Sequence, residues 1–109
     1  MNRPFNKLTD AQAERLALLL EELGEAQQAI GKILRHGYNC THPNGGPTNR
    51  DLLERELGDI LAAIDLLCMP ENYDLSNKLI QAAKSSKLQR VGKYLHHQSG
   101  GGCYAQPNT

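Results

Sequence analysis

The chain has 109 residues, a length that allows one domain, and its 12 basic and 12 acidic residues give a formal net charge of zero. This balance argues against a broad nucleic-acid-binding surface, and no apolar run reaches the roughly 18 residues that a membrane span requires. Hydrophobic residues make up 39% of the chain and aromatic residues only 5%, so the core must consist mostly of Leu, Ile and Ala, which favours packed helices.

The first predicted helix spans residues 9–36. Thr9 is a suitable N-cap, with Gln12 in the capping-box position, and Gly37 is a natural stop. Its apolar residues recur at helical spacing: Leu16, Leu19, Leu20, Leu23, Ile30, Ile33 and Leu34. Residues 37–47 then contain three glycines and two prolines, which predicts a loop, such as a lid over a site.

The second predicted helix spans residues 49–68, with Thr48 as its cap and Asp51 placed to favour the positive helix end. Its stripe consists of Leu53, Leu57, Ile60, Ile64 and Leu67. The third predicted helix spans residues 75–97, with Ile80, Lys84, Leu88, Val91 and Leu95 on one line. No stretch alternates as a strand would. We therefore predict an all-α domain over residues 1–98 and a flexible C-terminal tail over residues 99–109.

The N-terminus has no apolar signal-peptide core. The three cysteines, Cys40, Cys68 and Cys103, are odd in number and widely spaced, which makes a poor disulfide framework. These features predict a cytoplasmic protein without membrane association.

One motif occurs twice, as Glu-Leu-Gly-acid at residues 22–25 and again at residues 56–59. In each copy the acids are three residues apart and share one helix face, which borders the apolar arc. Two antiparallel helices packed on these arcs would bring Glu22, Glu25, Glu56 and Asp59 together. A bound cation would relieve their repulsion, and all-oxygen ligands favour Mg²⁺ or Mn²⁺. Gly24 and Gly58 would allow the two helices to approach closely.

Other interpretations of these residues are weaker. A single pair of acids three residues apart usually marks a solvated helix face, but two matching pairs on apolar edges are harder to explain in that way. A di-iron bundle would show Glu-x-x-His pairs, and neither helix has one. His36, Cys40 and His42 match no standard zinc spacing.

The acidic residues Glu21-Glu22-Leu23-Gly24-Glu25 and Glu56-Leu57-Gly58-Asp59 resemble the paired signature of the MazG-like all-α nucleoside triphosphate pyrophosphohydrolases. The likeness covers residues 13 to 97, and some segments look like small phage-type members, which would place the protein in a host cytoplasm. The resemblance implies a helical bundle completed by dimerisation, as a homodimer or homotetramer. It implies hydrolysis of an NTP or dNTP to NMP and pyrophosphate, with (d)GTP as one candidate substrate.

By position, the resemblance implies that Glu22, Glu25, Glu56 and Asp59 are the metal ligands. Glu21 and Glu22 would be the catalytic acids, with Glu21 orienting or deprotonating the attacking water. The long insertion between the motifs departs from the family pattern.

Five further residues are candidates for substrate binding: Lys32, His36, Lys84, Lys87 and Tyr94. Lys32 lies two turns beyond Glu25, near the same line, but a solvated lysine fits equally. Lys84 and Lys87 lie within or beside an apolar stripe and would either extend to solvent or meet an anion such as a triphosphate. His36 also suits the negative end of its helix, and Tyr94 suits core packing as well as stacking on a base.

Two other functions fit the same residues. The chain could be a non-catalytic helical interaction or regulatory protein that uses its acidic faces for solubility or partner contact. It could also be an enzyme like phosphoribosyl-ATP pyrophosphohydrolase, because the same bundle can host that reaction.

Overall fold

The computed structural model describes residues 5–98 and contains three α-helices, α1 (Asp10–His36), α2 (Asn49–Cys68) and α3 (Asn77–Arg90), followed by a short 3₁₀ helix, η1 (Val91–Lys93). The one β feature in this part of the chain is a single bridge between Thr41 and Thr48. The all-α prediction is therefore confirmed. The chain divides into two units, residues 1–74 and 75–109, and the predicted tail over residues 99–109 lies outside the described residues.

Both long helices begin at the capping boxes that the sequence encodes. The Thr9 Oγ1 accepts a hydrogen bond from the Gln12 N–H at 3.1 Å, and the Gln12 side chain accepts one from the Thr9 N–H at 2.9 Å. Thr48 and Asp51 repeat the arrangement at the start of α2, with both distances 3.1 Å. These bonds satisfy amides that would otherwise lack partners, so the predicted helix starts are confirmed.

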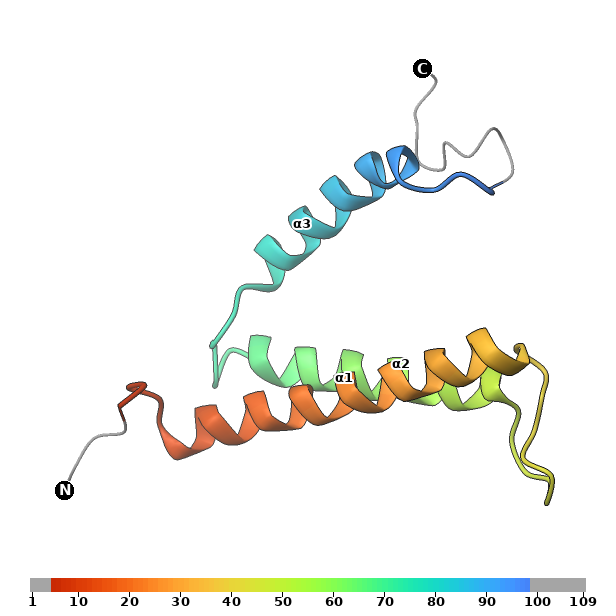
Figure 1. The fold of residues 1–109 in the computed structure, drawn as a ribbon. Helices are drawn as coiled ribbons and strands as arrows, with labels where there is room; N and C mark the ends of the chain where they lie inside the picture. Colours follow the sequence, from red (N-terminus) through yellow and green to blue (C-terminus); the bar gives the residue numbers. More distant parts are fainter. Residues whose placement is uncertain (1–4, 99–109) are drawn as a thin grey trace. The chain divides into compact units, whose positions relative to one another are not determined.

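In the first unit, α1 and α2 lie side by side and run in opposite directions, as a helical hairpin (Figure 1). The buried apolar residues are Ala26 and Ala29 on α1 and Ala63 and Leu67 on α2. The positions facing the partner helix are buried or half-buried and are three or four residues apart, as in a coiled coil. We call this row the seam; it includes Leu19, Glu22, Ala26, Ala29 and Ile33 on α1 and Leu52, Glu56, Ala63 and Leu67 on α2.

The leucine-rich part of the predicted α1 stripe does not face α2. Only Leu19 and Ile33 of that stripe belong to the seam. The other five are 41–82% exposed, and we call them the outer stripe: Leu16, Leu20, Leu23, Ile30 and Leu34. Alanines in the seam permit a closer approach between the helix backbones than leucines would, which explains why the hairpin pairs through the smaller residues.

Residues 37–48, which join the two helices, form turns held by hydrogen bonds. Gly37 adopts a positive φ of 90° and ends α1 by donating its N–H to the Ile33 carbonyl at 2.7 Å. Asn49, which is buried, donates its side-chain amide to the Gly37 carbonyl at 3.1 Å. The Arg50 guanidinium carbon lies 4.4 Å from the centre of the Tyr38 ring. The predicted loop therefore has a defined local structure.

An ion pair fastens the other end of the hairpin. Arg15 Nε lies 2.7 Å from a carboxylate oxygen of Asp74, and both side chains are largely buried, with exposed fractions of 18% and 12%. The backbone N–H of Asp74 also donates to the Leu67 carbonyl at 2.9 Å. The segment after α2 is thus tied back to the start of α1.

The second unit contains α3, which is shorter than predicted. Ser76 caps the helix by accepting the Leu79 N–H at 3.2 Å, and the α-helix ends at Arg90 rather than at residue 97. Gly92 lies just beyond that end, and a glycine inside a helix costs about 1 kcal/mol relative to alanine. The chain continues there as η1, a tighter helix common at helix ends. None of the helices in residues 5–98 has the combined length and hydrophobicity of a membrane-spanning segment.

Candidate metal centre

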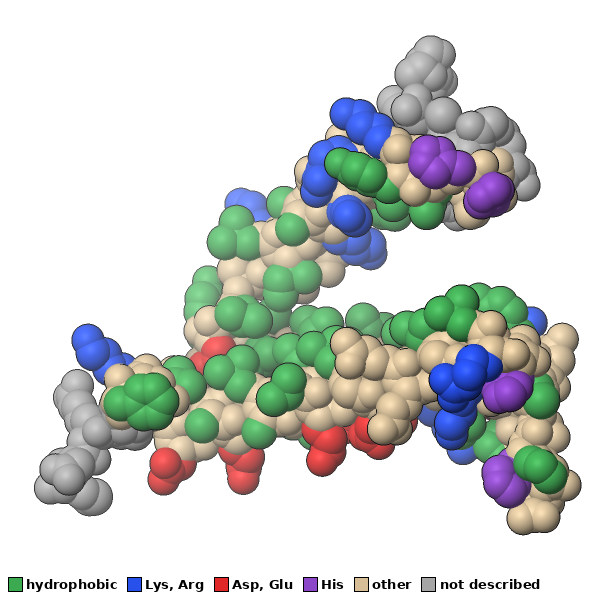
Figure 2. Space-filling view, in the orientation of Figure 1, with side chains coloured by type: hydrophobic (Ala, Val, Ile, Leu, Met, Phe, Trp, Pro, Cys, Tyr) green, Lys and Arg blue, Asp and Glu red, His purple; other side chains and the backbone are tan. Residues whose placement is uncertain are grey.

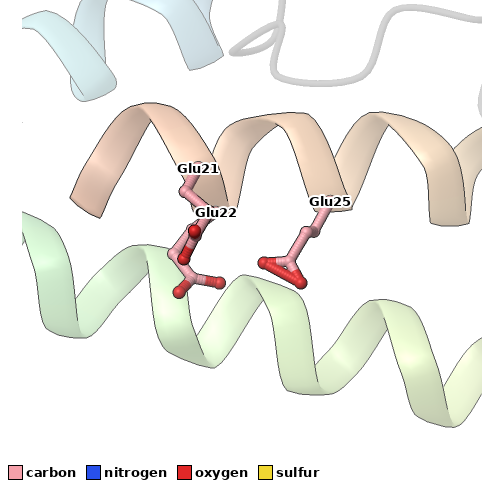
Figure 3. Close-up of side chains that lie close together, drawn as sticks. All are labelled: Glu21, Glu22 and Glu25. Carbon is pink, nitrogen blue, oxygen red and sulfur yellow. The ribbon is translucent and has the colours of Figure 1, made fainter. Parts of the chain in front are cut away.

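Five carboxylates gather at the middle of the hairpin. Glu22 lies in the seam on α1 and Glu56 in the seam on α2, and both are half-buried. Oxygen atoms of Glu22, Glu56 and Asp59 lie within 4.8 Å of one another. Oxygen atoms of Glu21, Glu22 and Glu25 form a second group of the same size, and Figure 3 shows these three side chains extending from α1 toward α2. Glu22 belongs to both groups and joins them.

The helical hairpin explains this gathering. Because α1 and α2 run antiparallel, the two copies of the Glu-Leu-Gly-acid motif face each other across the seam. The structure therefore brings together all four acids predicted as metal ligands, along with Glu21. It also refines their arrangement: Glu22 and Glu56 lie within the seam, whereas Glu25 and Asp59 are exposed at its edge.

The carboxylates repel one another. The pKa of Glu22 is raised above its ordinary value, first by burial and then by the nearby Glu56 and Asp59. The pKa of Glu25 is also raised, first by partial desolvation of the carboxyl and then by the charges of Glu22 and Glu21. Both shifts show that the site disfavours negative charge. The one ion pair within residues 5–98 joins Arg15 to Asp74, so no basic side chain forms an ion pair with the cluster.

Glu56 has a buried carboxylate oxygen, Oε2, that lacks a hydrogen-bond partner. A buried polar atom without a partner is costly, and the cost is greater for a charged group. The donor set is all carboxylate oxygen, which suits a hard divalent cation such as Mg²⁺ or Mn²⁺. The residues present therefore fit such an ion, which would satisfy Glu56 and offset the mutual repulsion.

The two motif glycines do not serve the packing of α1 on α2. A Cβ atom built on Gly24 or on Gly58 would meet nothing within 4 Å. The expectation that these glycines allow close approach of the two helices is therefore wrong for this hairpin, because the contact is made by Ala26, Ala29 and Ala63 instead. The glycines leave open surface beside the acids.

A basic region lies beyond the acids on the same helix. Lys32 and Arg35 line a groove on α1 together with Glu21 and Glu25. Lys32, Arg35 and His36 also line a second pocket, formed with the loop that follows α1. Figure 2 shows this separation of charge, with red side chains along the hairpin and blue and purple ones at its loop end.

Of these basic residues, Lys32 and His36 are among the predicted substrate-binding residues, whereas Arg35 is not. His42, also in the pocket, was considered only as part of a zinc site. The signal that could have identified the pocket is the absence of any Asp or Glu from residue 26 to residue 50.

Three predicted substrate-binding residues, Lys84, Lys87 and Tyr94, belong to the second unit. The Lys87 Nζ lies 5.8 Å from the centre of the Tyr94 ring, a cation–π arrangement. Tyr94 is 66% exposed, so the expectation that its ring packs in a core is wrong for this unit. Lys84 and Lys87 are exposed as well. A role in substrate binding stays a prediction for all three.

Zinc remains a poor fit to the structure. The clusters of possible metal ligands within residues 5–98 are made of carboxylates alone, and His36, Cys40 and His42 do not form one although they line the same pocket. Cys40 and Cys68 are free thiols.

In comparisons with known proteins, no family model, no curated protein and no solved structure matches this chain.

Proposed function

We propose that this protein is a divalent-metal-dependent nucleoside triphosphate pyrophosphohydrolase of the MazG-like all-α type. The observation that carries the proposal is the meeting of two matching acidic motifs across the hairpin seam, where Glu56 Oε2 is buried without a partner. Glu22, Glu25, Glu56 and Asp59 would hold Mg²⁺ or Mn²⁺. The bound ion would supply positive charge to phosphate oxygens and increase the acidity of water at the site.

The side chains of this protein would accept the proton and position the phosphates. Glu21 is exposed beside Glu22 and would take a proton from the attacking water. The water oxygen would form a bond to the α-phosphorus while the bond from that phosphorus to the bridging oxygen breaks. NMP and pyrophosphate would be released. Lys32, in the groove with Glu21 and Glu25, would hold the phosphates in line.

Self-association forms part of the proposal. The outer stripe on α1 leaves Leu20 72% exposed and Leu34 82% exposed, and on α2 Leu61 is 63% exposed. An exposed apolar row of this kind, interrupted on α1 by Gln27, favours burial against another helix. A second copy of the hairpin would provide one, which supports a homodimer or a homotetramer.

The test is a screen of all canonical NTPs and dNTPs, with phosphoribosyl-ATP included, in the presence of Mg²⁺ or Mn²⁺. We expect pyrophosphate, rather than orthophosphate, from at least one nucleotide, and GTP and dGTP are the first to examine. Glu56→Gln should lose turnover while its circular dichroism spectrum stays helical. Hydrolysis of phosphoribosyl-ATP alone would assign the reaction to that related class.

The exposed outer stripe also favours a second candidate, a non-catalytic module that binds a partner helix. That function needs the apolar row but not the carboxylate cluster. No hydrolysis across the whole panel, with either metal, would decide for it and against the enzyme.

A further inference from the structure

A second pocket lies at the loop end of the hairpin, away from the five carboxylates. It has a volume of about 660 Å³ and is formed by the last turns of α1, the loop that follows and the start of α2. Lys32, Arg35, His36 and His42 line it. We call it the loop pocket. Its size falls within the range of ligand-binding pockets, about 300–1,000 Å³.

The lining of the loop pocket is positive and lacks counter-charges. No Asp or Glu lines it. Neither Lys32 nor Arg35 takes part in an ion pair within residues 5–98. Residues 26–50 contain no acid, and the carboxylate of Asp51, which lies in the chain between the lining residues Asn49 and Leu52, accepts the Thr48 N–H. Unpaired cations that converge on one cavity indicate an anionic ligand.

Side chains, rather than the helix end, provide the donors of the loop pocket. The N–H groups of Asn49 and Arg50 donate to the carbonyls of Cys40 and Tyr38, and the N–H of Asp51 donates to Thr48 Oγ1. The first amides of α2 are therefore already satisfied.

Hydrogen bonds within the loop determine which nitrogen of His42 can donate. The Nδ1 atom of His42 accepts the Asn44 N–H at 3.1 Å, and the His42 carbonyl accepts the Gly45 N–H at 2.8 Å. With Nδ1 acting as an acceptor, the imidazole carries its hydrogen on Nε2 and can donate it. Together with the ammonium of Lys32 and the guanidinium of Arg35, this set suits phosphate oxygens.

The loop pocket and the carboxylate cluster are connected. Lys32 and Arg35 line both the loop pocket and the α1 groove that holds Glu21 and Glu25. Seven residues separate Glu25 from Lys32, which is about 10 Å along a helix. Both basic side chains line the groove beside Glu25, so a triphosphate bound at the carboxylates would extend toward them.

We propose that the loop pocket binds the pyrophosphate portion of the substrate, its β- and γ-phosphates. This inference rests on the proposed function for the identity of the ligand, but binding of the anion can be measured without turnover. Binding there would fix the orientation of the substrate: the pyrophosphate leaving group would lie toward the loop, and the nucleoside would lie on the opposite side of the carboxylates. The segment that forms the pocket is the insertion between the two acidic motifs.

The probe is inorganic pyrophosphate, titrated calorimetrically into the full chain without metal, in the presence of EDTA. Lys32→Gln/Arg35→Gln should weaken binding about tenfold or more, since charge-assisted hydrogen bonds are lost. The control variant Lys78→Gln/Arg90→Gln removes the same charges from exposed positions on α3 and should bind as the wild type does. Equal affinity of the two double variants, or no binding by the wild type, would overturn the proposal.

A measurement on the unmodified chain guards against misfolding of a variant. In NMR spectra, pyrophosphate should shift the imidazole resonances of His36 and His42, while those of His96 and His97, which belong to the second unit, stay in place. Shifts at His96 and His97 alone would contradict the assignment. So would shifts of His36 and His42 caused by an uncharged nucleoside and not by pyrophosphate, because the pocket would then be the base site.

The two proposals fail in different ways. If pyrophosphate binds the loop pocket but no nucleotide is hydrolysed, the proposed function is wrong and the anion site stands. If a nucleotide is hydrolysed but Lys32→Gln/Arg35→Gln binds pyrophosphate normally, the loop pocket assignment is wrong and the enzyme stands.

Discussion

Glu22 of α1 and Glu56 of α2 meet across the seam of the hairpin, each half-buried, and Oε2 of Glu56 has no hydrogen-bond partner there. Neighbouring seam positions are filled by Ala26 and Ala63, as expected of a packed interface. Two facing carboxylates in such a row weaken the hairpin unless something positive joins them. Without a cation, this carboxylate pair in the seam therefore lowers the stability of the hairpin.

Alanine at the motif glycines should stabilise the isolated hairpin. Gly24→Ala and Gly58→Ala each add a Cβ that meets nothing within 4 Å, so each should raise the free energy of unfolding by about 1 kcal/mol. Urea denaturation measures this change. A loss of stability in either variant would mean that a second chain packs against that glycine, and the loss should then depend on protein concentration.

Polar substitution of the outer stripe should disrupt self-association. Leu20 and Leu34 are the most exposed of its residues, so Leu20→Gln/Leu34→Gln should shift the molecular mass in light scattering toward that of one chain, with helix content retained. The control is Leu79→Gln on α3, where the leucine is 70% exposed but lies outside the stripe. An unchanged mass for the double variant would show that the outer stripe is not the interface.

The ion pair between Arg15 and Asp74 should make stability depend on acid pH. Hydrogen bonds from Arg15 lower the pKa of Asp74 below its ordinary value of 3.8, so the unfolded chain binds this proton more readily than the folded one. The contribution of Asp74 is therefore fully present above that value and is lost as the pH falls through the lowered pKa.

Asp74→Asn should accordingly be less stable than the wild type at neutral pH, and the difference should shrink as the pH falls below about 3.8. Thermal unfolding across this range measures it. Arg15→Gln should show the same trend, and combining the two changes should add little. A difference that grows with acidification would contradict the assigned sign.

Local signals in the sequence predicted the helix starts well. Thr9 with Gln12, and Thr48 with Asp51, act within one turn, so no long-range contact was needed to identify them. The meeting of the acids was also predictable, because a repeated motif on two antiparallel helices has one simple way to pair. The end of α3 was harder to predict from the sequence, because the helical periodicity continues past Gly92 although a glycine there disfavours the helix.

The sequence could not decide which row of α1 faces α2. Leu19 and Ile33 belong to one row at heptad spacing, and Leu20 and Leu34 belong to the other. Helical periodicity accommodates both rows, and only the packing with α2 selects the one that contains Ala26. The loop pocket could not be predicted from helical periodicity, because turns in residues 37–48 bring His42 into the same pocket as Lys32.

The measurement that tests the carboxylate cluster most directly is a titration of Mn²⁺ into the metal-free protein, followed by calorimetry and thermal unfolding. The wild type should bind the ion and gain about 2.7 kcal/mol of stability when free Mn²⁺ reaches one hundred times its dissociation constant. Glu54→Gln, an exposed acid of α2 outside the cluster, should respond as the wild type does. Glu56→Gln should bind weakly and gain little; an equal response from Glu56→Gln, or none from the wild type, would contradict a metal site at the hairpin seam.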